Sequence, residues 1–120
     1  MTKNLNLKKF LPDVHSPLEI DGPISDITIL RDSYGIPHVN AMNTTDVFFG
    51  QGFAAAQDRL WHMDSDRRRA YGRWAELVGP TGLEQDILIT KFQLKESSES
   101  DYKTLNDQTI DMLEAYASGV

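Results

Sequence analysis

The chain has 120 residues, of which 40% are hydrophobic and 25% are charged, and its net charge is −6. This length fits one small domain, the composition is that of a globular protein, and the acidic balance argues against nucleic acid or an anionic membrane as partner. Because the chain has no cysteine, it excludes disulfides, thiolate metal sites and a cysteine nucleophile.

Residues 1–25 are predicted to form an extended arm, and residues 26–120 form the rest of the domain. The arm holds three of the five prolines and shows little periodicity. Its lysines are not followed by the roughly 7–15 apolar residues of a secretory signal. The sequence as written therefore indicates a cytoplasmic protein, and no stretch approaches the ~20 apolar residues of a membrane span.

Residues 27–39 are predicted to form a β-hairpin. Two short apolar runs flank a loop that contains Gly35, and this arrangement is typical of a hairpin. Gly35 would supply the left-handed residue that closes the loop. Because Pro37 has no N–H to donate, the second strand should be an edge strand or begin late.

Residues 44–70 show the pattern of a long amphipathic helix. Thr44 or Thr45 can cap its start, and Gly72 can end it. One apolar face recurs at spacings of three and four, through Phe49, Phe53, Ala56, Leu60 and Met63. Such a helix would span on the order of 40 Å. Its apolar face is therefore larger than the rest of so short a chain can cover.

Two glycines in the first half of this helix leave part of its surface without side chains. Each glycine costs roughly 1 kcal/mol against alanine in a helix. Gly50 and Gly52 therefore predict that another backbone packs very close, with a loose helix start as the alternative.

The remainder of the chain is predicted to be mostly helical. Residues 75–82 hold two glycines and a proline and predict a turn, and residues 83–94 predict a short helix. Residues 95–101 are predicted to be a polar link. A last helix should begin near Asn106, which can cap it, and continue to the end of the chain.

Three polar groups could carry chemistry, and each also has a structural interpretation. Asp58, His62 and Asp66 share a helix face and could bind a divalent metal. No second histidine completes a zinc motif, however. The favoured interpretation is therefore a stripe of charged residues supported by an Asp64–Arg68 ion pair. The basic run 67–69 favours carboxylate partners over nucleic acid. His38 favours a packing or hydrogen-bonding role over catalysis.

Residues 57–59, Gln-Asp-Arg, interrupt the apolar pattern and are either buried with partners or solvated. The sequence also lacks a Gly-x-Ser-x-Gly elbow, a Ser-x-x-Lys motif and a phosphate-binding glycine loop. The residues alone thus identify no catalytic, cofactor-binding or metal-binding residue in this chain.

Four motifs follow one another along the chain. Residues 31–39 read Arg-Asp-Ser-Tyr-Gly-Ile-Pro-His-Val, and residues 48–63 contain Phe-Gly-Gln-Gly-Phe and Ala-Gln-Asp-Arg-Leu-Trp-His-Met. Residues 72–79 read Gly-Arg-Trp-Ala-Glu-Leu-Val-Gly, and residues 113–120 read Leu-Glu-Ala-Tyr-Ala-Ser-Gly-Val. In order and spacing they resemble the N-terminal part of the α chain in the penicillin amidase (penicillin acylase) family. The departures from the family pattern are mild, with phenylalanine at 53 for tyrosine and histidine at 62 for glutamine.

The resemblance implies an αββα N-terminal-nucleophile hydrolase, of which this chain is a fragment, α+β and mostly helical with an N-terminal hairpin. Family members cleave themselves into an α chain and a β chain, and the first serine of the β chain is the nucleophile. Calcium is possible in the full-length enzyme, and members are often exported, so the compartment stays open. Tyr34, Gly35, Pro37 and residues 57–59 would be scaffold, and residues 57–59 would be buried with partners from the rest of the enzyme.

The expected partners are the remainder of the precursor and a small N-acyl substrate, with neither nucleic acid nor membrane. The alternative is a non-catalytic helical interaction module that retains the family motifs. Because the long helix has an uncovered apolar face, the isolated chain is expected to self-associate.

Overall fold

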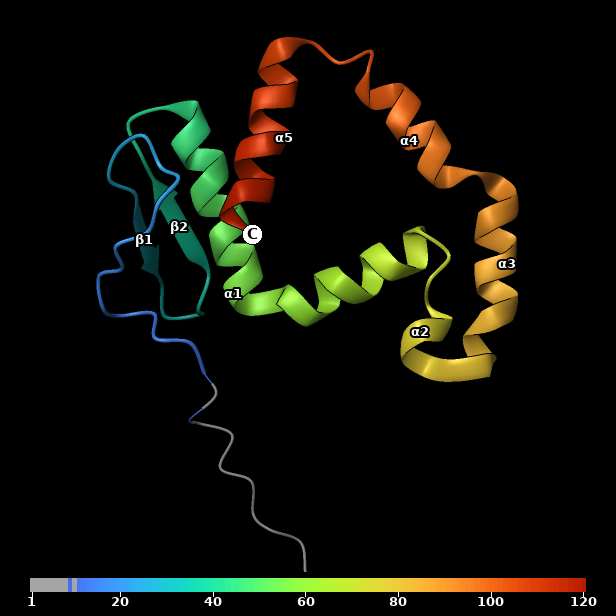
Figure 1. The fold of residues 1–120 in the computed structure, drawn as a ribbon. Helices are drawn as coiled ribbons and strands as arrows, with labels where there is room; N and C mark the ends of the chain where they lie inside the picture. The colour runs from blue at the N-terminus through green and yellow to red at the C-terminus, as the bar shows by residue number, and fades with distance from the viewer. Residues whose placement is uncertain (1–8, 10) are drawn as a thin grey trace, which may run out of the picture.

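The structure is a computed structural model that describes residue 9 and residues 11–120. The chain runs from a β-hairpin into an open ring of helices, so that the last helix returns beside the first (Figure 1). The elements are β1 (Thr28–Arg31), β2 (Pro37–Asn40), α1 (Thr44–Ala70), α2 (Ala75–Val78), the 3₁₀ helix η2 (Gly79–Gly82), α3 (Leu83–Phe92), α4 (Leu94–Tyr102) and α5 (Asp107–Gly119). The predicted mostly helical α+β architecture with an N-terminal hairpin is confirmed.

The hairpin forms as the sequence predicts. β1 and β2 are antiparallel, with Ile29 opposite Val39 and Leu30 opposite His38. The backbone N–H of Gly35 donates to the carbonyl oxygen of Asp32 at 2.9 Å, and Gly35 has a φ of 80°. This positive φ explains why the loop needs glycine, and β2 begins only at Pro37, as expected for a residue without an N–H.

Helix α1 has the predicted ends but a different cap. Asn43 caps it, because its side chain accepts from the backbone N–H of Asp46 at 2.8 Å. The prediction of Thr44 or Thr45 as the cap is therefore wrong by one residue. At the other end Gly72 has a φ of 63° and its N–H donates to Arg69, which stops the helix as predicted.

Helix α1 bends at Arg59, where φ is −139° and ψ is 19°. Before the bend Phe49 is buried, whereas Leu60 just after it is 57% exposed. The prediction of one continuous apolar face is therefore wrong, because a break in the helix turns the second half in a new direction (Figure 1).

The first half of α1 lies between the hairpin and α5, and its glycines make both contacts possible. A Cβ atom at Gly50 would lie 2.7 Å from a side-chain carbon of Val39. A Cβ atom at Gly52 would collide with the backbone oxygen of Tyr116, and one at Gly119 with the backbone oxygen of Phe49. The predicted close backbone approach is confirmed, and the partner backbone is that of α5.

Two other predictions need correction. Residues 95–101, predicted as a polar link, lie within α4. Residues 75–82, predicted as a turn, form the short α2 and η2. α4 is too polar, and α2 and η2 at four residues each are too short, to show the apolar periodicity that would reveal a helix. The predicted helices at 83–94 and after Asn106 are confirmed, and Asn106 accepts from the N–H of Thr109 at 2.9 Å.

The chain is open and has little core. Its radius of gyration is 18.1 Å, against about 13.6 Å for a compact domain of this length. Its accessible surface is 9808 Å², against roughly 6,600 Å² for a compact protein of this mass. Among the described residues, the buried hydrophobic side chains are Phe49, Ala54 and Ala115. Most of the apolar surface is therefore left uncovered.

Within the described residues, no helix combines the length and the apolar character that crossing a membrane requires.

Candidate functional site

The polar residues before the bend in α1 find a partner on the hairpin. One guanidinium nitrogen of Arg31 donates to Asp58 Oδ2 at 2.9 Å and to the carbonyl oxygen of Gly35 at 3.1 Å. The other terminal nitrogen donates to Gln57 Oε1 at 3.2 Å. Arg31, which is only 15% exposed, therefore supplies partners for Gln57 and Asp58 from this chain, and the expectation that the rest of the enzyme buries residues 57–59 with further partners stays a prediction.

The hairpin loop is organised by a carboxylate. Asp32 accepts from the backbone N–H groups of Tyr34 at 2.8 Å and Ile36 at 3.0 Å, and its other oxygen lies 3.3 Å from His38 Nε2. The Ile36 N–H, together with His38 and the Tyr34 N–H, holds the pKa of Asp32 below its ordinary value of 3.8. His38 thus has the hydrogen-bonding role that the sequence favoured.

The stripe of Asp58, His62 and Asp66 is divided between two ion pairs. His62 Nε2 lies 3.3 Å from Asp66 Oδ2, while Asp58 is paired with Arg31. In the part of the chain that the structure describes, no three histidine, cysteine or carboxylate side chains gather as they would to hold a metal ion. Calcium therefore stays a prediction for the full-length enzyme.

A buried carboxylate fastens the N-terminal arm to the start of α1. Asp46 is fully buried, and its oxygens accept from the N–H groups of Ile24 at 2.8 Å and Ser25 at 3.0 Å. They also accept from the Ser25 hydroxyl and the Asn43 amide, both at 2.7 Å. Burial alone would raise the pKa of Asp46, but these hydrogen bonds together lower it from 3.8.

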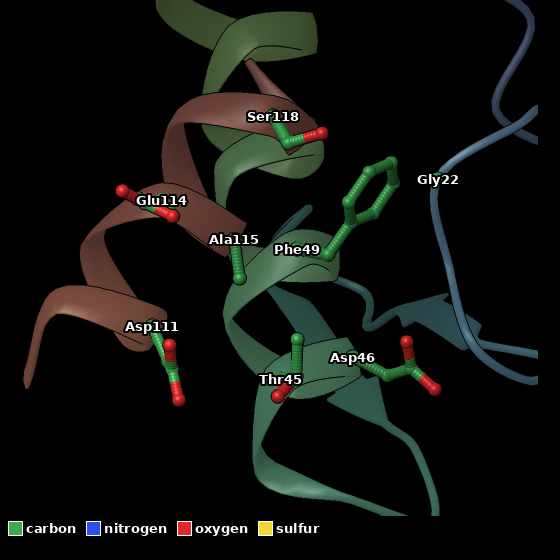
Figure 2. A pocket seen from close by; sticks show the side chains of 8 residues that line it. All are labelled: Gly22, Thr45, Asp46, Phe49, Asp111, Glu114, Ala115 and Ser118. Atoms are coloured by element: carbon green, nitrogen blue, oxygen red, sulfur yellow. The ribbon is translucent and has the colours of Figure 1, made fainter. Parts of the chain in front are cut away.

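Beside this clamp, the arm, α1 and α5 surround a hollow of about 260 Å³ (Figure 2). It is lined by Gly22, Thr45, Asp46, Phe49, Asp111, Glu114, Ala115 and Ser118. The Phe49 ring lies against Gly22, where a Cβ atom would be 2.7 Å from the ring. Asp46 uses both of its oxygens on the chain's own donors, and Glu114 accepts from the Tyr102 hydroxyl at 3.0 Å. This hollow is therefore a packing feature of the arm.

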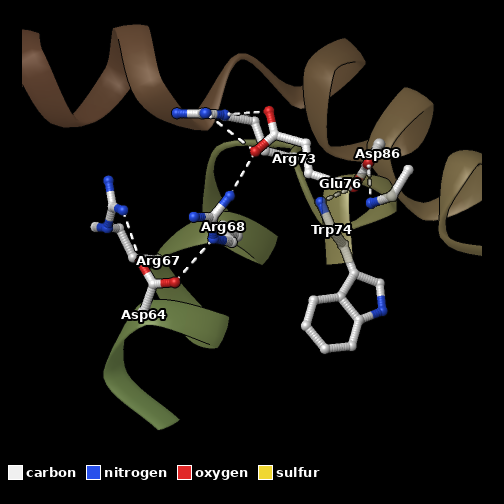
Figure 3. A network of polar contacts seen from close by, with 8 residues as sticks. Asp64, Arg67, Arg68, Arg73, Trp74, Glu76 and Asp86 are labelled. Atoms are coloured by element: carbon white, nitrogen blue, oxygen red, sulfur yellow. Dashed lines mark hydrogen bonds and ion pairs between the residues drawn. The ribbon is translucent and has the colours of Figure 1, made fainter. Parts of the chain in front are cut away.

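A chain of ion pairs holds the second half of α1 to α2 (Figure 3). Asp64 accepts from Arg67 at 2.7 Å and from Arg68 at 2.8 Å, and Arg68 also reaches Glu76. Arg73 donates to the same Glu76 at 2.7 Å, and this contact holds the pKa of Glu76 below 4.5. The predicted Asp64–Arg68 pair and the predicted carboxylate partners of the basic run are confirmed for Arg67 and Arg68.

The buried Asp86 on α3 contacts the backbone at the start of α2. Its two oxygens accept from the backbone N–H groups of Trp74 at 2.8 Å and Ala75 at 2.7 Å (Figure 3). It thereby satisfies the open donors at the start of α2. The Arg69 guanidinium lies 4.2 Å from the centre of the Trp74 ring, which adds a cation–π contact.

The candidate functional feature of this chain is its solvent-exposed apolar surface. Large hydrophobic side chains stand open on the second half of α1 and on α3, with Trp61 68% and Phe92 64% exposed. Others are open on the same helices, namely Leu60, Leu83, Ile87 and Leu88. Large apolar side chains are also exposed elsewhere in the chain, among them Leu30 on β1 and Leu113 on α5. Exposure on this scale usually marks surfaces that a partner covers.

Sequence reasoning missed the contacts that organise these surfaces. The Arg31–Asp58 pair joins residues 27 positions apart, and Asp46 reaches Ile24 over 22 positions. The sequence signal that could have revealed these contacts was the residue type at two positions. A carboxylate in the first turn of α1 and an arginine at the end of β1 both need hydrogen-bonding partners once they are buried.

The chain belongs to the penicillin amidase family, whose profile matches residues 26–120. It is 38% identical over 114 residues to penicillin acylase 2 proenzyme of a Pseudomonas species, covering 95% of this chain and 15% of that protein. It is 34% identical to penicillin G acylase of Escherichia coli, covering 80% of this chain and 11% of the relative. The chain is also 34% identical to the acyl-homoserine lactone acylase QuiP of Pseudomonas aeruginosa, covering 92% and 13%.

A solved structure shows the same fold. The thermostable penicillin G acylase from Alcaligenes faecalis matches with a TM-score of 0.72 and 32% identity, covering 81% of this chain and 52% of that one. The predicted similarity to the fold of an N-terminal-nucleophile hydrolase is thereby confirmed. The chain spans about 11–15% of the length of these curated relatives.

Proposed function

We propose that this chain is the N-terminal part of the α chain of an acylase that hydrolyses the amide bond of penicillin-like or other N-acyl substrates to an acid and a free amine. The observation that carries the proposal is the family match over residues 26–120. The names of the relatives support it, because penicillin acylase and acyl-homoserine lactone acylase both describe removal of an acyl group.

The proposed nucleophile is the hydroxyl of a serine at the N-terminus of the β chain, outside this chain. The α-amino group of that serine would be the base, since its ordinary pKa of about 7.7–8.0 leaves much of it neutral near neutral pH. It would take the hydroxyl proton as the oxygen attacks the amide carbon, and then give that proton to the departing amine. Water would hydrolyse the resulting ester, and β-chain donors would stabilise each oxyanion.

In this proposal the present chain supplies scaffold rather than chemistry. The Arg31 contacts and the Asp46 clamp fix the hairpin and the arm against α1. The open apolar surface around Trp61 and Phe92 is covered by the remainder of the precursor. A self-contained interaction module, the alternative, would need a closed core, which three buried apolar side chains do not provide.

Amide hydrolysis by the product of the full reading frame tests the proposal directly. A panel of chromogenic N-acyl anilides with short, long and aromatic acyl groups should release the coloured amine with that product and none with residues 1–120 alone. Inactivity of the full product on every amide would contradict the proposal, and so would hydrolysis by the short chain. The acyl group that reacts fastest would define the substrate class.

Light scattering tests the uncovered surface. The isolated chain should self-associate at high concentration, and replacing Leu88 and Phe92 by lysine should shift it toward the monomer. The matched control is Gln85→Lys on the same helix, which adds charge at an exposed polar position and should change little. A monomeric wild-type chain at high concentration would contradict the proposed docking surface.

A further inference from the structure

We propose that α1 is hinged at Arg59, so that two separately packed units of this chain turn relative to each other. The first, the hairpin unit, comprises β1, β2, residues 44–58 of α1, and α5. The second, the network unit, comprises residues 64–70 of α1 together with α2, η2 and α3. Figure 1 shows the two units at opposite sides of the ring, connected by the bent α1 and by α4.

The contacts of the hairpin unit end immediately before the bend. Gly52 lies against the backbone of Tyr116, so α1 and α5 touch backbone to backbone. The last attachments are those of Arg31 to Gln57 and Asp58, at 3.2 Å and 2.9 Å. The backbone leaves helical geometry at the next residue, Arg59.

The contacts of the network unit begin one helical turn later. Asp64 is the first residue after the bend with an ion pair to a neighbouring arginine of this unit. Arg68 carries the connection to Glu76, and Asp86 ties α3 to the start of α2 at 2.7 Å and 2.8 Å. These groups contact one another, and within the described residues they make no hydrogen bond or ion pair with the hairpin unit.

The segment between the two sets of contacts is exposed. Residues 59–62 all lie open to solvent, and the ion pair of His62 is with Asp66 on the same helix, whereas a packed helix turns an apolar residue toward its neighbours every three or four positions. The usual local causes of a sharp bend are proline, a glycine–serine pair or an inserted side chain, and residues 57–63 contain no proline, glycine or serine. The geometry therefore points to a bend that no packing in the described chain holds at one angle.

The second connection between the units is also weak. α4 has no buried residue, its Lys95–Glu99 ion pair at 3.6 Å lies within the helix itself, and its Tyr102 hydroxyl donates to the exposed Glu114 of α5 at 3.0 Å. A solvated helix of this kind links two bodies without fixing the angle between them. The use that we assign to the hinge, settling the network unit against the rest of the precursor, rests on the proposed function. The hinge itself is a property of this chain.

Paired spin labels measure the hinge directly, and the absence of native cysteine makes the labelling selective. Gln85→Cys with Gln108→Cys spans the two units. Gln51→Cys with Gln108→Cys lies within the hairpin unit, and Ala70→Cys with Gln85→Cys lies within the network unit. All four positions are exposed. The between-unit pair should give a distance distribution clearly broader than that of either within-unit pair.

A narrow distribution for the between-unit pair would overturn the hinge. Broad distributions for the within-unit pairs would overturn the two packed units on which the hinge depends. Arg31→Met should broaden the between-unit distribution further, because it frees the last helical turn before the bend. Arg59→Met, which removes an exposed side chain, should leave it unchanged. Because no activity is measured, failure of the hinge is distinguishable from failure of the proposed function.

Discussion

The hairpin unit and the network unit use the two halves of one helix in different ways. In the hairpin unit, glycines let α1 and α5 meet backbone to backbone, and the contact leaves no room for water or a side chain. In the network unit, ion pairs hold α1 to α2, Asp86 ties α3 to the start of α2, and Phe92 faces outward. The first arrangement depends on the close fit between the backbones of α1 and α5. The second depends on polar contacts, and both units leave large apolar side chains exposed, among them Leu30 in the first and Phe92 in the second.

The largest loss of stability is expected where the backbones of α1 and α5 touch in the hairpin unit. Gly52→Ala should destabilise the chain by about 3 kcal/mol, because its Cβ meets the fixed carbonyl of Tyr116. In an open helix the same change would stabilise by roughly 1 kcal/mol. Urea unfolding followed by circular dichroism measures the difference.

Gly50→Ala is the matched control for that variant. Its Cβ meets side-chain carbons of Val39 and Ile27 instead of a backbone oxygen, so the loss should be smaller than for Gly52. Equal losses for the two variants would show that the α1–α5 backbone contact has no special weight.

Asp46 gives the hairpin unit a defined dependence on pH. Its hydrogen bonds to Ser25, Ile24 and Asn43 lower its pKa in the folded chain below 3.8. The stabilisation is therefore fully present above the unfolded-state value and is lost as pH falls through the folded-state value. Asp46→Asn should lower the urea midpoint at pH 7, and the difference from wild type should shrink below about pH 4. A difference that stays constant with pH would contradict the role of the charged clamp.

A smaller loss is expected at the contact between the hairpin and α1. Arg31→Met keeps much of the side-chain volume but removes the donors to Asp58, Gln57 and Gly35. It should cost about 2 kcal/mol, since hydrogen bonds to a charged group are lost. Arg59→Met, at an exposed arginine of the same region, should change stability by less than about 0.5 kcal/mol. Similar losses for both would mean that the Arg31 geometry is unimportant.

The smallest effect should come from the network unit and should depend on salt. Glu76→Gln weakens the contacts with Arg73 and Arg68, which are partly exposed. Surface ion pairs are screened by salt, so the loss should be small at low ionic strength and vanish at high ionic strength. Thermal unfolding at two salt concentrations checks this, with Gly52→Ala as the salt-insensitive reference.

Sequence patterns over short stretches correctly predicted α1, α5 and the hairpin, because their formation depends on neighbouring residues in the chain. Periodicity indicated α1, the glycine loop indicated the hairpin, and Asn106 indicated the start of α5, all confirmed. The glycine pair at 50 and 52 also predicted a close backbone neighbour. The family motifs located the fold, because their order spans most of the chain.

The remaining features depend on distant residues or on weak local signals. Nothing in residues 57–63 predicts the bend at Arg59, and α4 has only the Lys95–Glu99 pair to support a helix. The partner of Asp58 is 27 positions away on β1, so spacing along the helix could not reveal it. The separation into residues 1–25 and 26–120 stays a prediction, with residues 1–8 and 10 outside the described residues.

The central claim is that this chain belongs to a larger, self-cleaving acylase, and the intact mass of the natural protein tests it most directly. Measured under native conditions and again after denaturation, the account predicts a complex that separates into a small chain sharing this N-terminus and a larger chain that begins with serine. A single species of 13.6 kDa under both conditions would contradict the account.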